Sequence, residues 1–194
     1  GNGNNKNNNS SNNDSTDNIP LRAIHHFGDL SYARGNAHIW DDWLDMIQPV
    51  TTRIPLMVGV GNHEYDHTSG GEGRDPSHIS NDSGFHPYWG NMADDSGGEC
   101  GIPTSKRFYV PQNGNGVFWY SYDYGMTHVI MLSSEHDLSS TSTQYQWLHT
   151  DLYKVNRTKT PWIIVESHRP MYCSQPFWQD NAVGIAMRME FESL

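Results

Sequence analysis

The chain has 194 residues, which is enough for one domain with a hydrophobic core. Its formal net charge at pH 7 is −10, and this acidity argues against a protein that binds nucleic acid or membrane surfaces in general. No apolar run approaches the roughly 20 residues of a membrane-spanning helix. A phosphorylated substrate is not excluded, because a bound metal can supply positive charge locally.

The two ends of the chain suggest a piece of a longer protein. Half of residues 1–18 are Asn and none is apolar, so we expect this segment to be disordered and residues 19–194 to form one domain. Residue 1 is Gly rather than Met. Residues 182–194 have a helical pattern that stops without a terminating Gly, Asn or Pro. We therefore expect an internal fragment.

The first predicted elements are a strand, a helix and a strand. Residues 21–27 read as a strand, and residues 55–60 are a short apolar run typical of a buried strand. Between them, residues 37–50 place apolar side chains at helical spacing, and Pro49 is expected to end that helix. This order is the βαβ unit of a layered α/β protein.

The second half adds a long loop and further regular elements. Residues 66–106 are Gly-rich and polar, and a loop of that length in a compact domain is usually functional or mobile. Residues 117–124 and 127–133 read as a hairpin. Residues 142–155 form an amphipathic helix, and residues 161–166 form a third buried strand.

Cysteines and glycosylation motifs say little about the compartment. Cys100 and Cys173 are compatible with a disulfide or with two free thiols. Motifs for N-glycosylation fit a secreted glycoprotein, although short motifs match by chance. They begin at Asn8, Asn9, Asn13, Asn81 and Asn156.

Side chains that can bind metals follow each of the three buried strands. Asp29 and Tyr32 come after the first strand, and Asn62 and His63 come after the second. His168 comes after the third. Each residue alone has an ordinary explanation as a turn, cap or packing residue. Because sites in such sheets form beyond the carboxyl ends of strands, the recurrence favours a shared site.

The residue types suit a pair of metals. A carboxylate such as Asp29 can bridge two cations, and the phenolate of Tyr32 is a hard anionic ligand suited to a trivalent ion. The amide oxygen of Asn62 and the imidazole of His168 suit a divalent ion. Two metals about 3.5–4 Å apart can clamp a phosphate. His63 is then placed to contact the phosphoryl group or to protonate the leaving oxygen.

The motifs that contain these residues resemble those of the purple acid phosphatases, in the calcineurin-like metallophosphoesterase superfamily. The matching blocks, in order, are GDLSY at 28–32, GNHE at 61–64 and VESH at 165–168. Linking stretches such as GGECGIPTSKRF are similar too, and the likeness extends over about residues 21–192. It implies an α/β fold, a sandwich of two mixed β-sheets flanked by helices, of which residues 19–194 form a partial catalytic domain.

The resemblance also implies a role for each residue. Asp29 would bridge the two metals, and Tyr32 would bind Fe(III) and give a purple charge-transfer band. Asn62 and His168 would bind a divalent metal, which is Zn, Mn or Fe(II). His63 would be the catalytic residue that contacts the phosphate. The implied reaction is the hydrolysis of phosphoric monoesters, as in an acid phosphatase, with a metal-bound hydroxide as nucleophile.

Two blocks of the family pattern are missing. They are an earlier GDxG, whose Asp binds iron, and a final GHxH, whose two His bind one metal each. We therefore expect residues 1–194 alone to bind metal poorly and to hydrolyse little. Residues 174–194 also lack the His pair of some plant-type members, so leaving-group protonation rests on His63. Trp178 and Gln179 are weaker candidates for the mouth of the site.

Two other functions remain open. One is a phosphodiesterase or nucleotide pyrophosphatase on the same metals, although Tyr32 favours the purple acid branch. The other is a non-catalytic glycoprotein on a degraded phosphatase scaffold, which would explain the missing blocks. The expected partners are small phosphorylated substrates, with no nucleic acid and no membrane, and the oligomeric state stays open. The expected location is secreted or vacuolar/lysosomal.

Overall fold

The computed structural model describes residues 21–66, 75–79, 95–172, 174, 178–192 and 194. The predicted disorder of residues 1–18, most of the predicted long loop, the side chains of Trp178 and Gln179, and Cys173 lie outside the described residues. Cys100 is a buried free thiol. No helix in the described part of the chain is long and apolar enough to cross a membrane.

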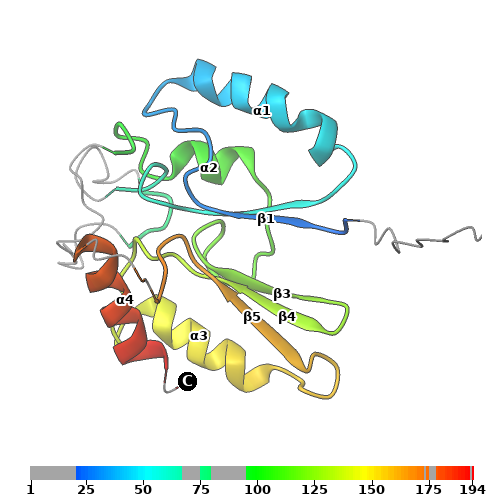
Figure 1. Cartoon of the computed structure of the whole chain (residues 1–194), viewed down its shortest axis with the longest axis vertical. Helices are drawn as coiled ribbons and strands as arrows, with labels where there is room; N and C mark the ends of the chain where they lie inside the picture. Colours follow the sequence, from blue (N-terminus) through cyan, green and yellow to red (C-terminus); the bar gives the residue numbers. More distant parts are fainter. Residues whose placement is uncertain (1–20, 67–74, 80–94, 173, 175–177, 193) are drawn as a thin grey trace, which may run out of the picture.

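The smaller sheet is the predicted βαβ unit. Strands β1 (Ile24–Phe27) and β2 (Leu56–Gly59) pair in parallel. Helix α1 (Ala37–Thr51) connects them and lies on the outer side of this sheet (Figure 1). Its Trp40 is 1% exposed and anchors the helix in the core. The apolar spacing in the sequence therefore predicts this unit correctly.

Helix α1 continues through Pro49, so the prediction that Pro49 ends it is wrong. Proline loses its own bond to the carbonyl four residues earlier and its ring crowds that carbonyl, but bonds donated by later residues still close the last turn. The backbone N–H of Thr52 donates to the carbonyl of Gln48 at 3.1 Å, and that of Ile54 donates to Val50 at 3.1 Å. A proline one turn from the end of a helix is therefore tolerated here.

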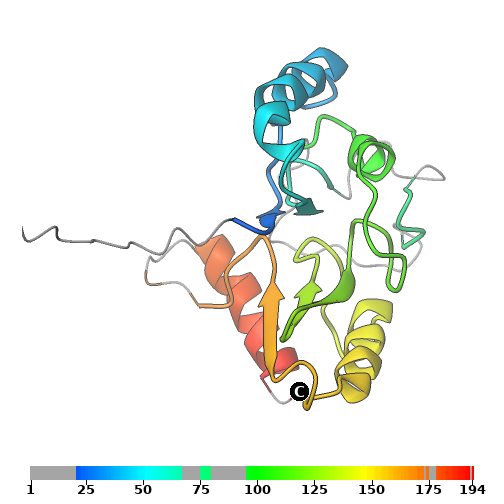
Figure 2. The same cartoon turned by 90° about the vertical axis from the view of Figure 1, so that its right-hand side faces the viewer.

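The larger sheet has the order β3–β4–β5. Strands β3 (Tyr120–Tyr124) and β4 (Thr127–Met131) form the predicted antiparallel hairpin, and β5 (Trp162–Glu166) pairs with β4 in parallel. Helices α3 (Thr143–Lys154) and α4 (Trp178–Phe191) lie at the end of the molecule away from α1 (Figure 2). The expected two-sheet α/β fold is confirmed, with a mixed larger sheet and, among the described residues, a parallel smaller one.

A short helix that the sequence analysis does not predict lies in the long loop. Helix α2 (Ile102–Arg107) starts after Gly101, which has φ 72°, and carries a proline in its first turn. Proline in the first turn is a recognisable helix start, because the N–H that it lacks has no partner there. The surrounding glycines and polar residues concealed this signal.

Hydrogen bonds join the two sheets. The hydroxyl of Tyr120 donates to the carbonyl of Val58 at 2.9 Å. His25 Nδ1 lies 2.8 Å from Glu166 Oε1, and its Nε2 lies 2.7 Å from the hydroxyl of Tyr122. These bonds fix β1 against the carboxyl end of β5 and thereby hold the two sheets together.

A buried histidine fastens α3 to the larger sheet at the other end of β4. His128 is 7% exposed, and its two ring nitrogens lie 2.6 Å from Asp123 Oδ1 and 2.9 Å from Asp151 Oδ2. Burial lowers the pKa of His128, but hydrogen bonds to the two carboxylates outweigh it, so the pKa is raised above its ordinary value. The charged form of His128 is therefore favoured by folding.

This raised pKa predicts a pH-dependent contribution to stability. The contribution is fully present below the unfolded-state pKa of about 6.5 and is lost as pH rises through the higher folded-state pKa. In urea unfolding, the free-energy difference between wild type and His128→Gln should be larger at about pH 5.5 than at about pH 8.5. His149→Gln, on the exposed face of α3, is the control and should show no such difference. An equal difference at both pH values for His128→Gln would contradict the role.

Candidate metal centre

The loop after β1 holds two of the predicted ligands in unusual backbone conformations. Asp29 has φ 54° and Tyr32 has φ 55°, both in the left-handed region that non-glycine residues rarely adopt. The Tyr32 hydroxyl donates a 2.8 Å hydrogen bond to Asp29 Oδ2. Backbone strain of this kind clusters at functional sites, where surrounding contacts maintain it.

Glu64 supplies those surrounding contacts. Its Oε2 accepts hydrogen bonds from the backbone N–H of Asp29 at 2.6 Å and of Gly61 at 2.9 Å, and its Oε1 accepts one from Leu30 at 2.6 Å. The side chain is fully buried, and burial raises its pKa to about 7, against the opposing effect of these backbone bonds. Glu64 thus ties the loop after β1 to the loop after β2. Glu64 belongs to the GNHE motif, but the sequence alone predicts no role for it.

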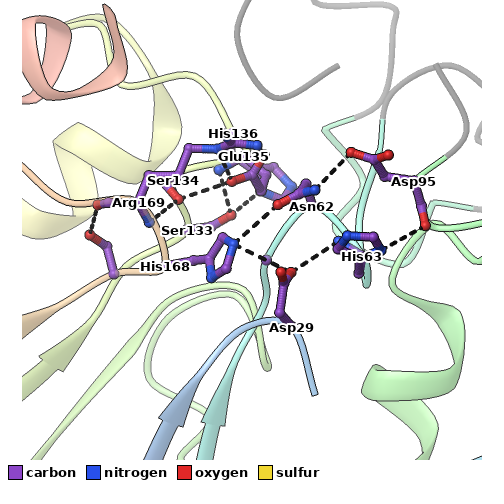
Figure 3. A network of polar contacts seen from close by, with 12 residues as sticks. Asp29, Asn62, His63, Asp95, Ser133, Ser134, Glu135, His136, His168 and Arg169 are labelled. Atoms are coloured by element: carbon purple, nitrogen blue, oxygen red, sulfur yellow. Dashed lines mark hydrogen bonds and ion pairs between the residues drawn. The ribbon is translucent and has the colours of Figure 1, made fainter. Parts of the chain in front are cut away.

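His168 brings the loop after β5 to the same place. Its Nε2 lies 3.1 Å from Asn62 Oδ1 and 3.3 Å from Asp29 Oδ1 (Figure 3). Its Nδ1 lies 3.2 Å from the carbonyl of Phe27, which can only accept. Nδ1 therefore carries the proton in the neutral ring, and the lone pair of Nε2 faces two oxygens.

Such an arrangement is complementary to a cation. Three acceptor atoms, from a carboxylate, an amide and an imidazole, are directed at one point, and this donor set suits a divalent metal. A Cβ on Gly61 would lie 2.5 Å from Asp29 Oδ1 and 2.8 Å from His168 Cδ2, so only glycine lets these donors approach. In the described part of the chain, no group of three or more His, Cys, Asp or Glu could hold a metal. The fit therefore depends on the amide of Asn62.

Tyr32 lies on the other side of the Asp29 carboxylate. Oδ1 of Asp29 faces His168, whereas Oδ2 faces the Tyr32 hydroxyl. The hydrogen bond to Asp29 raises the pKa of Tyr32 to about 12, so without a metal the phenol keeps its proton. The Asp29 carboxylate therefore has one oxygen turned toward each of these two side chains. Among the described residues, fewer atoms that could bind a metal lie on the Tyr32 side of Asp29 than on the His168 side.

His63 lies beside these donors. Its backbone N–H is 3.3 Å from Asp29 Oδ1, and its ring packs against that of Tyr32 at 4.3 Å between centroids. Its Nδ1 lies 3.1 Å from the backbone carbonyl of Asp95. The structure thus brings together all five predicted residues, Asp29, Tyr32, Asn62, His63 and His168, and their roles in binding metal and substrate stay predictions.

Other histidines near the strands have packing roles. His25 points toward the larger sheet, whereas His26 lies on the opposite face near Trp43, at 6.0 Å between ring centroids. Burial lowers the pKa of His26. His136 is buried and stacks on Tyr65 at 4.2 Å.

A buried ion pair that the sequence does not predict lies behind His168. Arg169 Nε donates to Glu135 Oε1 at 2.7 Å, and Nη2 donates to Oε2 at 3.2 Å. The backbone N–H of Arg169 also donates to Ser134 Oγ at 3.1 Å. This pair fixes the loop after β5 to the loop after β4 (Figure 3). Partners 34 residues apart leave no local pattern in a sequence.

These strand ends and their donors have known counterparts. The family model of the calcineurin-like phosphoesterases matches residues 18–191. The chain therefore belongs to the calcineurin-like phosphoesterase family.

Within that family the chain is similar to purple acid phosphatases, as its motifs predicted. It is 36% identical over 184 residues to the protein named probable inactive purple acid phosphatase 9 from Arabidopsis thaliana. This alignment covers 88% of this chain and 26% of that protein. It is 34% identical over 155 residues to the nucleotide pyrophosphatase/phosphodiesterase of Hordeum vulgare. That alignment covers 80% of this chain and 38% of the barley protein.

A solved structure shows the same likeness. The purple acid phosphatase PPD1 from yellow lupin (Lupinus luteus) seeds superposes with a TM-score of 0.66 at 35% identity, over 81% of this chain and 25% of that chain. The resemblance to purple acid phosphatases is thereby confirmed. The chain spans about a quarter of the length of PPD1 and of the Arabidopsis relative.

Proposed function

We propose that the protein is a metal-dependent hydrolase of phosphoric monoesters, an acid phosphatase with Fe(III) and a divalent ion, Zn, Mn or Fe(II). The main support is the convergence of Asp29, Asn62 and His168 on one point, with the second oxygen of Asp29 turned to Tyr32. Membership of the phosphoesterase family supports the same reaction class. The substrates proposed are small phosphorylated molecules.

The residues of the chain would bind and orient. Asn62, His168 and one oxygen of Asp29 would hold the divalent ion, and Tyr32 with the other oxygen would hold Fe(III). Two such ions, when bound, neutralise the phosphate charge and supply the nucleophile. His63 keeps the proton on Nδ1 toward the Asp95 carbonyl, which leaves Nε2 for the substrate. A protonated His63 ring would donate a hydrogen bond from Nε2–H to a phosphoryl oxygen and would give that proton to the leaving alkoxide oxygen, which departs as the alcohol.

Metal analysis and colour test this proposal. Elemental analysis of the natural protein, purified without chelators, should find two metals per chain, one of them iron. Tyr32→Phe should lose the visible charge-transfer band, because that band needs the phenolate on iron. Tyr109→Phe, whose ring is 90% exposed, is the control and should keep it. Two metals without iron would exclude the purple acid branch, and none would exclude the hydrolase.

Two relatives support other activities. The name of the barley protein favours a diesterase or nucleotide pyrophosphatase on the same site. Rates on p-nitrophenyl phosphate and on bis-p-nitrophenyl phosphate separate the two, and a faster diester reaction would favour this alternative. The word inactive in the name of the Arabidopsis relative favours a non-catalytic protein. Metal at full stoichiometry without hydrolysis of either ester would support that reading.

The location proposed is secreted or vacuolar/lysosomal. Asn156 begins an Asn-Arg-Thr motif and is exposed in the connection between α3 and β5. Its side-chain oxygen accepts a hydrogen bond from the backbone N–H of Thr158 at 3.0 Å, so the motif lies in a turn. A glycan on Asn156 in the natural protein, detected by peptide mass spectrometry, would support passage through the secretory pathway, and an unmodified Asn156 would weaken it.

A further inference from the structure

Asp95 touches two of the proposed site residues at once. Its Oδ2 accepts a 2.7 Å hydrogen bond from Asn62 Nδ2, and its backbone carbonyl lies 3.1 Å from His63 Nδ1 (Figure 3). Asp95 lies more than 30 positions after both residues. Neither the sequence motifs nor the roles proposed above use its carboxylate.

The carboxylate of Asp95 determines which way the Asn62 amide points. An asparagine amide has an oxygen that accepts and an NH₂ group that donates, and the two ends have nearly the same shape. An ionised carboxylate can only accept, so it holds the NH₂ group. The oxygen of Asn62 is then left facing His168 Nε2, at 3.1 Å. The opposite orientation would present NH₂ hydrogens to a cation, which would repel it.

Asp95 is itself held in place. The next residue, Ser96, donates from its backbone N–H at 3.0 Å and from its hydroxyl at 2.5 Å to Asp66 Oδ2. Ser96 and Asp66 are both fully buried. Further along, the backbone N–H of Gly101 donates to the carbonyl of Glu64 at 2.7 Å. The segment that carries Asp95 is therefore fastened to the GNHE turn by protein hydrogen bonds alone.

We propose that Asp95 is a positioning residue that orients the Asn62 amide, so that its oxygen is directed at the divalent ion. This role rests on the proposed function, in which Asn62 is a ligand. Partners that orient ligands from outside the coordination sphere typically change metal affinity by about 10–100-fold when they are removed. The backbone carbonyl of Asp95 orients His63 in the same way, and a side-chain substitution leaves that contact in place.

The test is a Co²⁺ titration of the natural protein after its metals have been removed, followed by the visible absorption of the bound ion. Asp95→Ala should weaken Co²⁺ binding by about 10–100-fold without lowering the melting temperature of the metal-free chain. Asp95→Asn should restore most of the affinity, because its amide oxygen still accepts from Asn62. Asp45→Ala, an exposed carboxylate on α1, controls for the loss of one negative charge.

The outcomes distinguish a positioning role for Asp95 from a direct ligand role and from the absence of a divalent site. Unchanged affinity in Asp95→Ala would overturn the positioning role while leaving the proposed function intact. Equal loss in Asp95→Ala and Asp95→Asn would overturn it too, because it would make Asp95 a direct ligand. A wild-type natural protein that binds no Co²⁺, although it is folded, would overturn the divalent site itself and with it the proposed function.

Discussion

Replacing Gly28 or Gly61 with alanine should abolish metal binding. A Cβ on Gly28 would lie 2.6 Å from the backbone N of Gly61 and 2.8 Å from His168 Cγ, and a Cβ on Gly61 would lie 2.5 Å from Asp29 Oδ1. Backbone atoms and ligand atoms cannot move away without separating the three loops. For Gly28→Ala, whose φ is +95°, we also expect a loss of at least about 2 kcal/mol in the free energy of unfolding.

A substitution at a third glycine separates the effect of backbone strain on stability from the effect of a steric clash on metal binding. Gly125 has φ +59° in the hairpin turn, and a Cβ there would meet nothing within 4 Å. Gly125→Ala should therefore lose about 1–2 kcal/mol from backbone strain but keep wild-type Co²⁺ affinity. Gly61→Ala, which has no positive φ, should lose affinity more than stability. Wild-type affinity in Gly61→Ala would show that the loops do not meet as closely as in the structure.

The sequence is informative about the site because metal-binding types of side chain recur directly after predicted strands. Asp29, Asn62 and His168 each follow a strand, so the rule that sites lie at carboxyl strand ends predicts their meeting without knowledge of the packing. The apolar spacing of the strands and helices predicts the same layered fold. The helix that contains Pro49 is predicted, but its end is predicted too early, because bonds donated by residues after Pro49 still close the last turn.

What the sequence does not reveal is how the ligands are held. Glu64, Asp95 and Glu135 each act through bonds to residues about 30 or more positions away, such as the 35-residue separation between Asp29 and Glu64. No periodicity or short motif encodes such pairs. The sequence therefore predicts which side chains gather at the strand ends, whereas only the folded structure shows what orients them.

Removing Arg169 should be among the most destabilising changes outside the ligands. Glu135 is 2% exposed, and Arg169→Ala would leave its carboxylate buried without the guanidinium. Breaking one side of a buried ion pair typically costs about 3–5 kcal/mol in the free energy of unfolding. Urea unfolding of the full chain measures this loss. Asp41→Ala removes the exposed partner of Arg107, at 3.3 Å, and should cost less than about 1 kcal/mol.

The double variant Glu135→Leu/Arg169→Met shows whether the pair serves stability or the site. Replacing a buried ion pair by apolar residues of similar volume is often neutral for stability, so the double variant should recover most of the loss. Its Co²⁺ affinity should stay below that of the wild type, because the guanidinium no longer ties the residue after His168 to the loop after β4. If affinity returned together with stability, the ion pair would have no specific part in placing His168. If stability alone returned, the fold would be preserved by apolar packing while the position of the ligand depends on charge.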